Sequence, residues 1–139
     1  MRGQAIPDTD HVSRYCKPSV VENGLPLVGA FVPRPTEEFV SVNWLEHLGS
    51  KDLAAALERV RVRFQTRSYR LRPNGRFVVL GVGRARVAAA EIQRQIHFEH
   101  LPLPDDGSHA GIRGIGEDDL AIATELARLV GPDDVHPAI

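Results

Sequence analysis

Proline and glycine recur so often in the first forty residues that this stretch has no room for a long helix. Proline removes a backbone donor and clashes with the preceding helical turn, and glycine favours turns. The breaking residues are Pro7, Pro18, Gly24, Pro26, Gly29, Pro33 and Pro35. The amino-terminal part of the chain is therefore predicted to form short strands between turns, at His11 to Cys16 and at Leu27 to Val32.

The first of these strands carries polar side chains at alternate positions. Side chains alternate between the two faces of a strand, so His11, Ser13 and Tyr15 share one face, and Arg14 and Cys16 share the other. The strand is therefore a candidate for the wall of a functional site.

A further short strand is predicted over residues 38–42, followed by a short helix. Asn43 is a favourable helix cap, and Glu46 three residues later completes the pattern of a capping box. The helix is expected to contain Trp44 and to end at Gly49.

Two principal helices are predicted, at about 51–62 and 117–130. In the first, Leu53, Leu57 and Val60 recur at helical spacing. Residues 59–64 also alternate with period two, so a strand beginning near residue 60 is an open alternative. The second helix starts with three acidic residues at 117–119, where the helix dipole favours negative charge, and Gly131-Pro132 ends it.

The remaining segments predict strands that pair with their neighbours in sequence. The Asn74-Gly75 pair is typical of a tight hairpin turn and joins a strand near 68–71 to one over 77–82. Further strands are predicted over 95–103 and 108–112. Residues 84–94 fit a helix or a strand equally well.

Strands and helices do not alternate regularly, and the sequence contains no internal repeat. This pattern predicts an α+β fold in which a mainly antiparallel sheet packs against the two principal helices. The chain has 139 residues, which is the size of one compact domain, so residues 1–139 are expected to form a single domain. A chain of this length buries enough surface to fold without a disulfide or a metal.

Several classes of protein are excluded or disfavoured by composition. The net charge of -1 excludes a strongly basic protein of the histone kind. No apolar run approaches the ~20 residues of a membrane-spanning helix, which excludes a membrane-spanning protein. The amino terminus lacks the apolar stretch of a secretory signal peptide, so a cytoplasmic location and no membrane partner are expected. The single cysteine, Cys16, lies near Arg14 and Lys17 and is a candidate nucleophile, although a small buried cysteine is commoner.

Charge is distributed unevenly along the chain. Residues 51–94 contain 11 basic and 3 acidic residues, whereas residues 95–139 contain 2 basic and 9 acidic residues. The basic residues include an arginine-rich strip with an interleaved tyrosine: Arg59, Arg61, Arg63, Arg67, Tyr69, Arg70, Arg72 and Arg76. Such a strip predicts an interaction module that binds a nucleic-acid or protein partner. Alternatively, the arginines form a solvated face or pair with the acidic third of the chain.

Histidines suggest a second, catalytic hypothesis. His100 and His109 flank the loop 101–108, and a hairpin there would place two imidazoles near one cleft as acid and base. The corresponding function is a metal-independent hydrolase or nuclease that acts on phosphodiesters, with Arg70 or Arg113 steadying the phosphate. The alternative is that both histidines are structural.

Neither a metal nor a cofactor is predicted. A strand places His97 and His100 on opposite faces, which separates them as metal ligands. Gly81 and Gly83 match only half of a dinucleotide-binding fingerprint, because Arg86 occupies the position of its third glycine. No Walker loop or other cofactor motif is present, so whether the protein is an enzyme stays open.

Overall fold

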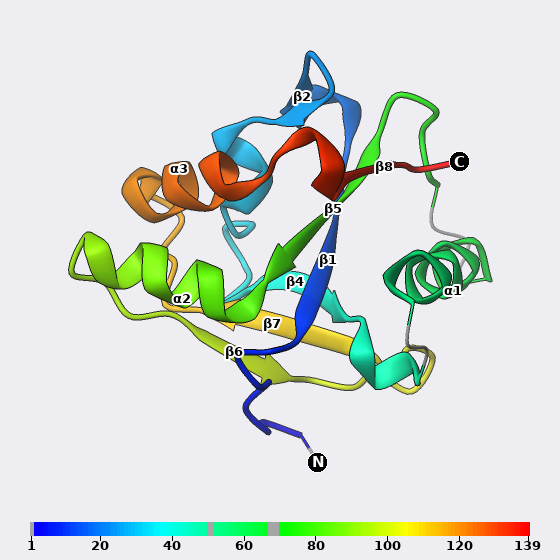
Figure 1. Ribbon diagram of the computed structural model, residues 1–139, viewed down its shortest axis with the longest axis horizontal. Helices are drawn as coiled ribbons and strands as arrows, with labels where there is room; N and C mark the ends of the chain where they lie inside the picture. Colours follow the sequence, from blue (N-terminus) through cyan, green and yellow to red (C-terminus); the bar gives the residue numbers. More distant parts are fainter. Residues whose placement is uncertain (1, 50–51, 67–69) are drawn as a thin grey trace.

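Six strands form one antiparallel sheet in the order β6-β7-β4-β1-β5-β8 in a computed structural model that describes residues 2–49, 52–66 and 70–139 (Figure 1). The strands are β1 (His11–Cys16), β4 (Val40–Trp44), β5 (Arg76–Gly81), β6 (His97–His100), β7 (His109–Arg113) and β8 (Val135–Pro137). A separate two-stranded sheet joins β2 (Val21–Glu22) to β3 (Leu25–Pro26).

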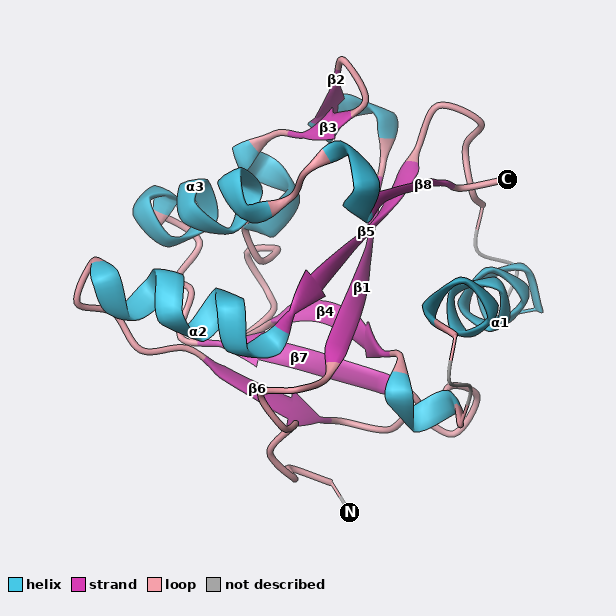
Figure 2. Ribbon diagram, viewed as in Figure 1, coloured by secondary structure: helices cyan, strands magenta, loops and turns pink. Residues whose placement is uncertain are grey.

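Helices cover both faces of the six-stranded sheet (Figure 2). On one face, α2 (Val82–Glu91) and α3 (Leu120–Leu129) pack over a large apolar cluster that includes Val12, Val78 and Ile112. On the other face, α1 (Leu53–Thr66) packs over a smaller cluster around Phe77. The predicted α+β fold, a mainly antiparallel sheet with packed helices in one domain, is confirmed.

The described chain contains three α-helices, whereas two principal helices were predicted. The additional helix is α2, within the segment that fitted helix and strand equally well. Its alanines at 85, 88 and 89 are buried, so their small side chains let the helix lie close to its neighbours. Packing against the rest of the protein therefore determines that this segment is a helix, which the local sequence alone does not.

The bounds of both predicted helices shift in the structure. The predicted start of the first helix near residue 51 lies outside the described residues, and α1 runs from Leu53 to Thr66. The alternating residues 59–64 are therefore helical, because Ala56, Leu57 and Val60 are buried together on one side. In the second helix, Asp119 is the cap and its side chain accepts a hydrogen bond from the Ile122 amide, so the helix begins at Leu120 rather than 117.

The predicted capping box at Asn43 is wrong. Asn43 and Trp44 are the last two residues of β4, and only a single 3-10 turn, Glu46–Leu48, follows. The Asn43 amide is buried and donates hydrogen bonds to Asp106 and Ser108 instead of capping a helix. Glu46 accepts from the His11 backbone amide and contacts the His11 ring.

One predicted strand is wrong, and a second is absent from the part of it that the structure describes. The segment Leu27 to Val32 contains a 3-10 helix, Val28–Phe31, that buries Ala30 and Phe31 against the main core. Near the Asn74-Gly75 turn, Arg70 and Leu71 belong to no strand, and residues 68 and 69 lie outside the described residues. The turn therefore connects the segment after α1 to β5, whose partners are β1 and β8.

None of the helices in the described part of the chain is long and apolar enough to span a membrane.

Candidate functional site

The central strands β1 and β4 form a fork. They pair at Val12 with Trp44 and at Ser13 with Asn43, and beyond this point β1 continues only beside β5. Arg14 lies at the fork, where its Nε donates to the Ala30 carbonyl at 2.5 Å and its Nη1 donates to the Ser41 carbonyl at 2.7 Å. The guanidinium therefore ties the 3-10 helix 28–31 to β4 where the two strands separate.

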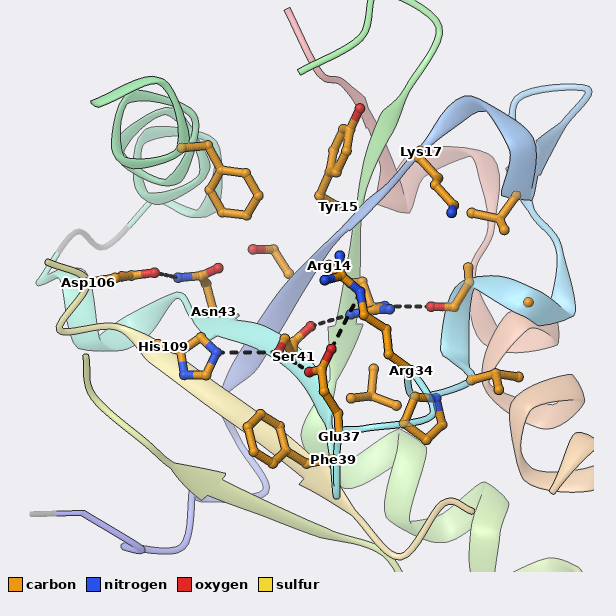
Figure 3. Close-up of a pocket in the computed structure, with 18 of the residues that line it drawn as sticks. Arg14, Tyr15, Lys17, Arg34, Glu37, Phe39, Ser41, Asn43, Asp106 and His109 are labelled. Atoms are coloured by element: carbon orange, nitrogen blue, oxygen red, sulfur yellow. Dashed lines mark hydrogen bonds and ion pairs between the residues drawn. The ribbon is translucent and has the colours of Figure 1, made fainter. Parts of the chain in front are cut away.

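A pocket of about 500 Å³ occupies this fork (Figure 3). It lies partly on the sheet face that carries α1, because Ser13, Asn43 and His109 are register partners whose side chains share one face. The helix covers only the β1, β5 and β8 end of that face, through contacts with Phe77, Val79 and Ala138. On the remaining part of the face, the pocket is lined by the polar residues Ser13, Asn43 and His109 and by apolar side chains such as Phe39.

Cations outnumber carboxylates among the pocket residues. The cations are Arg14, Lys17 and Arg34, and the carboxylates are Glu37 and Asp106. Glu37 contacts Arg34 at 3.4 Å, and this arginine side chain is 73% exposed at the mouth of the pocket. The described pocket residues therefore carry a small excess of positive charge.

Ser13 is buried in the pocket wall without a protein partner. The residue is 1% exposed, and its Oγ makes no hydrogen bond to any described residue. A buried hydroxyl without a partner costs about 1–3 kcal/mol. Ser13 also belongs to the residues that line the pocket, so this buried hydroxyl lies in the pocket wall.

A buried hydrogen-bond network closes one end of the pocket. The Asn43 amide donates to Asp106 Oδ2 at 2.8 Å and to Ser108 Oγ at 2.8 Å, and the Ser108 hydroxyl donates to Asp106 Oδ1 at 2.9 Å. The Ser108 backbone amide also donates to the same carboxylate. This network fixes the loop between β6 and β7 onto β4 and so positions His109 at the start of β7.

His109 faces the pocket next to Ser41. Its Nδ1 lies 2.8 Å from the Leu101 carbonyl, and its Nε2 lies 3.4 Å from Ser41 Oγ. The Ser41 hydroxyl also lies 3.3 Å from Glu37 Oε2. Phe39 packs edge-on against the imidazole, with ring centroids 5.9 Å apart.

The predicted pair His100 and His109 is not brought together. His100 is opposite Ala110 in the β6–β7 register, so the adjacent His109 points to the other face of the sheet. His100 packs against Trp44 and His47, and its Nε2 contacts the Gly107 carbonyl at 2.7 Å. Only His109 lies in the pocket.

The described arginines of the predicted strip lie on α1 and on the segment that follows it. Arg59, Arg61 and Arg63 lie on α1 and contact backbone carbonyls of Leu48, Pro137 and Asp105, respectively. Arg61 also pairs with Glu58 and lies over the Phe77 ring. The contacts with Pro137 and Asp105 join the basic segment 51–94 to the acidic segment 95–139.

The rest of the strip lies after α1. Arg70 and Arg72 are exposed, Arg76 contacts the Pro73 and Gly75 carbonyls, and Arg67 and Tyr69 lie outside the described residues. Arg113, the other predicted phosphate ligand, pairs with Glu99 at 2.7 Å and lies outside the pocket. Partner binding through the strip stays a prediction.

Cys16 is a buried thiol in the main core. It is 1% exposed, and burial raises its pKa to about 11, an effect that the nearby positive charge of Arg14 only partly opposes. The thiolate is the reactive form, so the environment of Cys16 disfavours a nucleophilic role.

We expect Cys16 to resist modification in the folded protein. An aromatic disulfide reagent at pH 8 is expected to leave the native thiol unmodified and to react with it stoichiometrically in urea, as measured by absorbance. Rapid reaction under native conditions would contradict this assignment.

Part of the pocket was predicted from the sequence. The strand His11 to Cys16 was expected to line a site, and Ser13, Arg14 and Tyr15 line the pocket. Ser41 was missed, because its place in the pocket depends on the divergence of β1 and β4, which no local pattern encodes.

The described residues contain no group of three or more histidine, cysteine, aspartate or glutamate side chains arranged to hold a metal ion. No protein-family model matches the chain, and no curated protein or solved structure does either.

Proposed function

We propose that the protein binds a small phosphate ester that carries an aromatic ring, the chemistry of a nucleotide, in the pocket between β1 and β4. The observation that carries this proposal is the buried Ser13 hydroxyl, which has no partner among the described residues and lines a pocket rich in cations. A phosphate oxygen is a strong acceptor for such a hydroxyl.

The cations support the phosphate part of the ligand. Arginine guanidinium groups match phosphate oxygens with paired donors, and lysine adds a point charge. Arg14 lies on β1, Lys17 directly follows β1, and Arg34 lies in the segment before β4.

Aromatic side chains support the ring part of the ligand. Tyr15 and Phe64 of α1 line the pocket, with ring centroids 6.1 Å apart. Phe39 lines it beside His109 (Figure 3). Aromatic rings stack on nucleobases with little sequence preference. The volume of about 500 Å³ falls within the range of small-molecule sites, about 300–1,000 Å³.

Replacing Ser13 with alanine is expected to weaken nucleotide binding and leave the fold intact. One hydrogen bond to a charged group contributes about 1.5–3 kcal/mol, so the dissociation constant should rise about 10- to 100-fold. The free energy of unfolding without ligand should stay unchanged or increase, because the substitution removes a buried hydroxyl with no partner. Calorimetric titration with the four nucleoside monophosphates, combined with urea denaturation, measures both quantities.

Ser19→Ala is the matched control, because Ser19 is exposed and lies outside the pocket. It should bind nucleotide as the unsubstituted protein does. The corresponding uncharged nucleosides should bind more weakly, since they lack the phosphate. Equal affinities for Ser13→Ala and the unsubstituted protein, or no binding of any nucleoside monophosphate, would refute the proposal.

A further inference from the structure

We propose that Ser41 and His109 form a nucleophile and general-base pair that cleaves phosphodiesters in this pocket. This inference rests on the proposed function, because it assigns a reaction to the same phosphate-binding site. It retains His109 from the predicted acid and base pair and replaces His100 with a serine as the second group.

The contacts of His109 fix its tautomer. A backbone carbonyl only accepts hydrogen bonds, so the 2.8 Å contact with the Leu101 carbonyl requires the proton on Nδ1. The neutral ring then presents the lone pair of Nε2 to Ser41 Oγ, which lies 3.4 Å away. This is the arrangement in which an imidazole accepts the proton of a serine hydroxyl, with the base oriented by a third group.

The Ser41 hydroxyl lies between two acceptors. Its Oγ is 3.4 Å from His109 Nε2 and 3.3 Å from Glu37 Oε2. Both distances exceed those of tight hydrogen bonds, about 2.5–3.0 Å between oxygens. In the structure the Ser41 hydroxyl donates to Glu37, and catalytic hydrogen bonds often form fully only when substrate binds, so the reaction requires the hydroxyl to turn from Glu37 toward the imidazole.

Positive charge lies next to the nucleophile. The guanidinium of Arg14 donates to the Ser41 carbonyl at 2.7 Å, and Arg34 contacts Glu37 on the other side (Figure 3). These cations oppose the repulsion between an anionic diester and an incoming oxygen, and they stabilise the charge on the phosphoryl oxygens in the transition state.

The reaction balances without an external oxidant or reductant. Ser41 Oγ attacks phosphorus and transfers its proton to His109 Nε2, and the bond from phosphorus to the leaving oxygen breaks as that oxygen takes the proton. Water then attacks the phosphoserine diester with His109 as base, and Ser41 Oγ leaves with a proton. One water is consumed, and the products are a phosphate monoester and an alcohol.

The first test is covalent labelling with an alkyl fluorophosphonate. Formation of the bond from Oγ to phosphorus expels fluoride, and His109 takes the hydroxyl proton. Mass spectrometry should show one adduct, located on Ser41. The Ser41→Ala variant should not be labelled there, and His109→Ala should be labelled at least 100-fold more slowly, since general-base catalysis contributes about 10²–10⁴-fold.

The second test is hydrolysis of bis(p-nitrophenyl) phosphate, followed by release of p-nitrophenolate. Turnover should fall at least 100-fold in Ser41→Ala and in His109→Ala. The matched controls are Ser19→Ala and His97→Ala, because both residues are exposed and outside the pocket. They should keep full turnover and labelling.

Calorimetric titration of the same variants with nucleoside monophosphates separates this inference from the proposed function. Nucleotide binding without labelling or diester hydrolysis in the unsubstituted protein would overturn the catalytic pair and leave the binding function standing. Labelling and turnover that persist in Ser41→Ala would overturn it as well. Failure of nucleotide binding would refute the proposed function, whatever the labelling result.

Discussion

Replacing Gly114 with alanine is expected to lower the free energy of unfolding by about 3 kcal/mol or more. Gly114 has φ of +99°, a conformation in which side chains other than glycine are strained by about 1–3 kcal/mol. A Cβ at this position would lie 2.5 Å from the Gln95 carbonyl oxygen and 3.2 Å from the Ile96 Cα. These are backbone atoms, so relief requires the turn after β7 to move away from the segment before β6, which adds an overpacking cost.

Chemical denaturation of Gly114→Ala measures this loss directly, and the midpoint of thermal unfolding should fall by roughly 10 °C. Gly116→Ala is the matched control two residues away, because its Cβ would meet no atom within 4 Å and its φ is not positive. The control should change stability by less than about 0.5 kcal/mol. Equal stability of the two variants would show that the close approach between these segments is not maintained.

The turn at Gly114 also bears on the candidate site. It ends β7, and β7 pairs with β6 on one side and with β4 on the other. His109 and Ser41 belong to the β7–β4 pair, two residues apart in register. The loss of stability in Gly114→Ala therefore measures how much the backbone packing at this turn stabilises the strands that carry His109 and Ser41.

The sequence predicted the fold class because hydrophobic periodicity and turn residues act locally. The spacing of Leu53, Leu57 and Val60 marks α1, and Gly131-Pro132 marks the end of α3. The capping box at Asn43 failed for a non-local reason. Asp106, 63 residues away, accepts a hydrogen bond from the Asn43 amide, and this buried contact outweighs a cap that contributes about 1 kcal/mol.

The candidate site was less predictable than the fold. Strand alternation placed Ser13 and Tyr15 on one face, and the histidine spacing drew attention to His109. The same alternation, applied across the β6–β7 register, separates His100 from His109, but that register is known only once the strands are paired. Ser41 lies beside His109 because β4 pairs with β7, although the two residues are 68 positions apart in the sequence.

Replacing Phe77 with alanine is expected to lower the free energy of unfolding by about 3–5 kcal/mol, the range for loss of a buried phenylalanine. Phe77 is fully buried on β5 beneath α1. Its ring centroid lies 5.4 Å from those of Tyr15 and Phe64, and the Arg61 guanidinium lies over it. Removing the ring leaves a cavity in the cluster that attaches α1 to the sheet.

This substitution is also expected to weaken nucleotide binding, because Tyr15 and Phe64 pack on Phe77 and line the pocket with their other surfaces. Phe98→Ala is the matched control, since Phe98 is 3% exposed in the apolar cluster on the opposite face of the sheet and does not line the pocket. Both variants should lose stability, yet in the folded state only Phe77→Ala should raise the dissociation constant in calorimetric titration. A similar loss of affinity in both variants would mean that the loss follows from general destabilisation. Unchanged affinity in Phe77→Ala would mean that the aromatic wall takes no part in ligand binding.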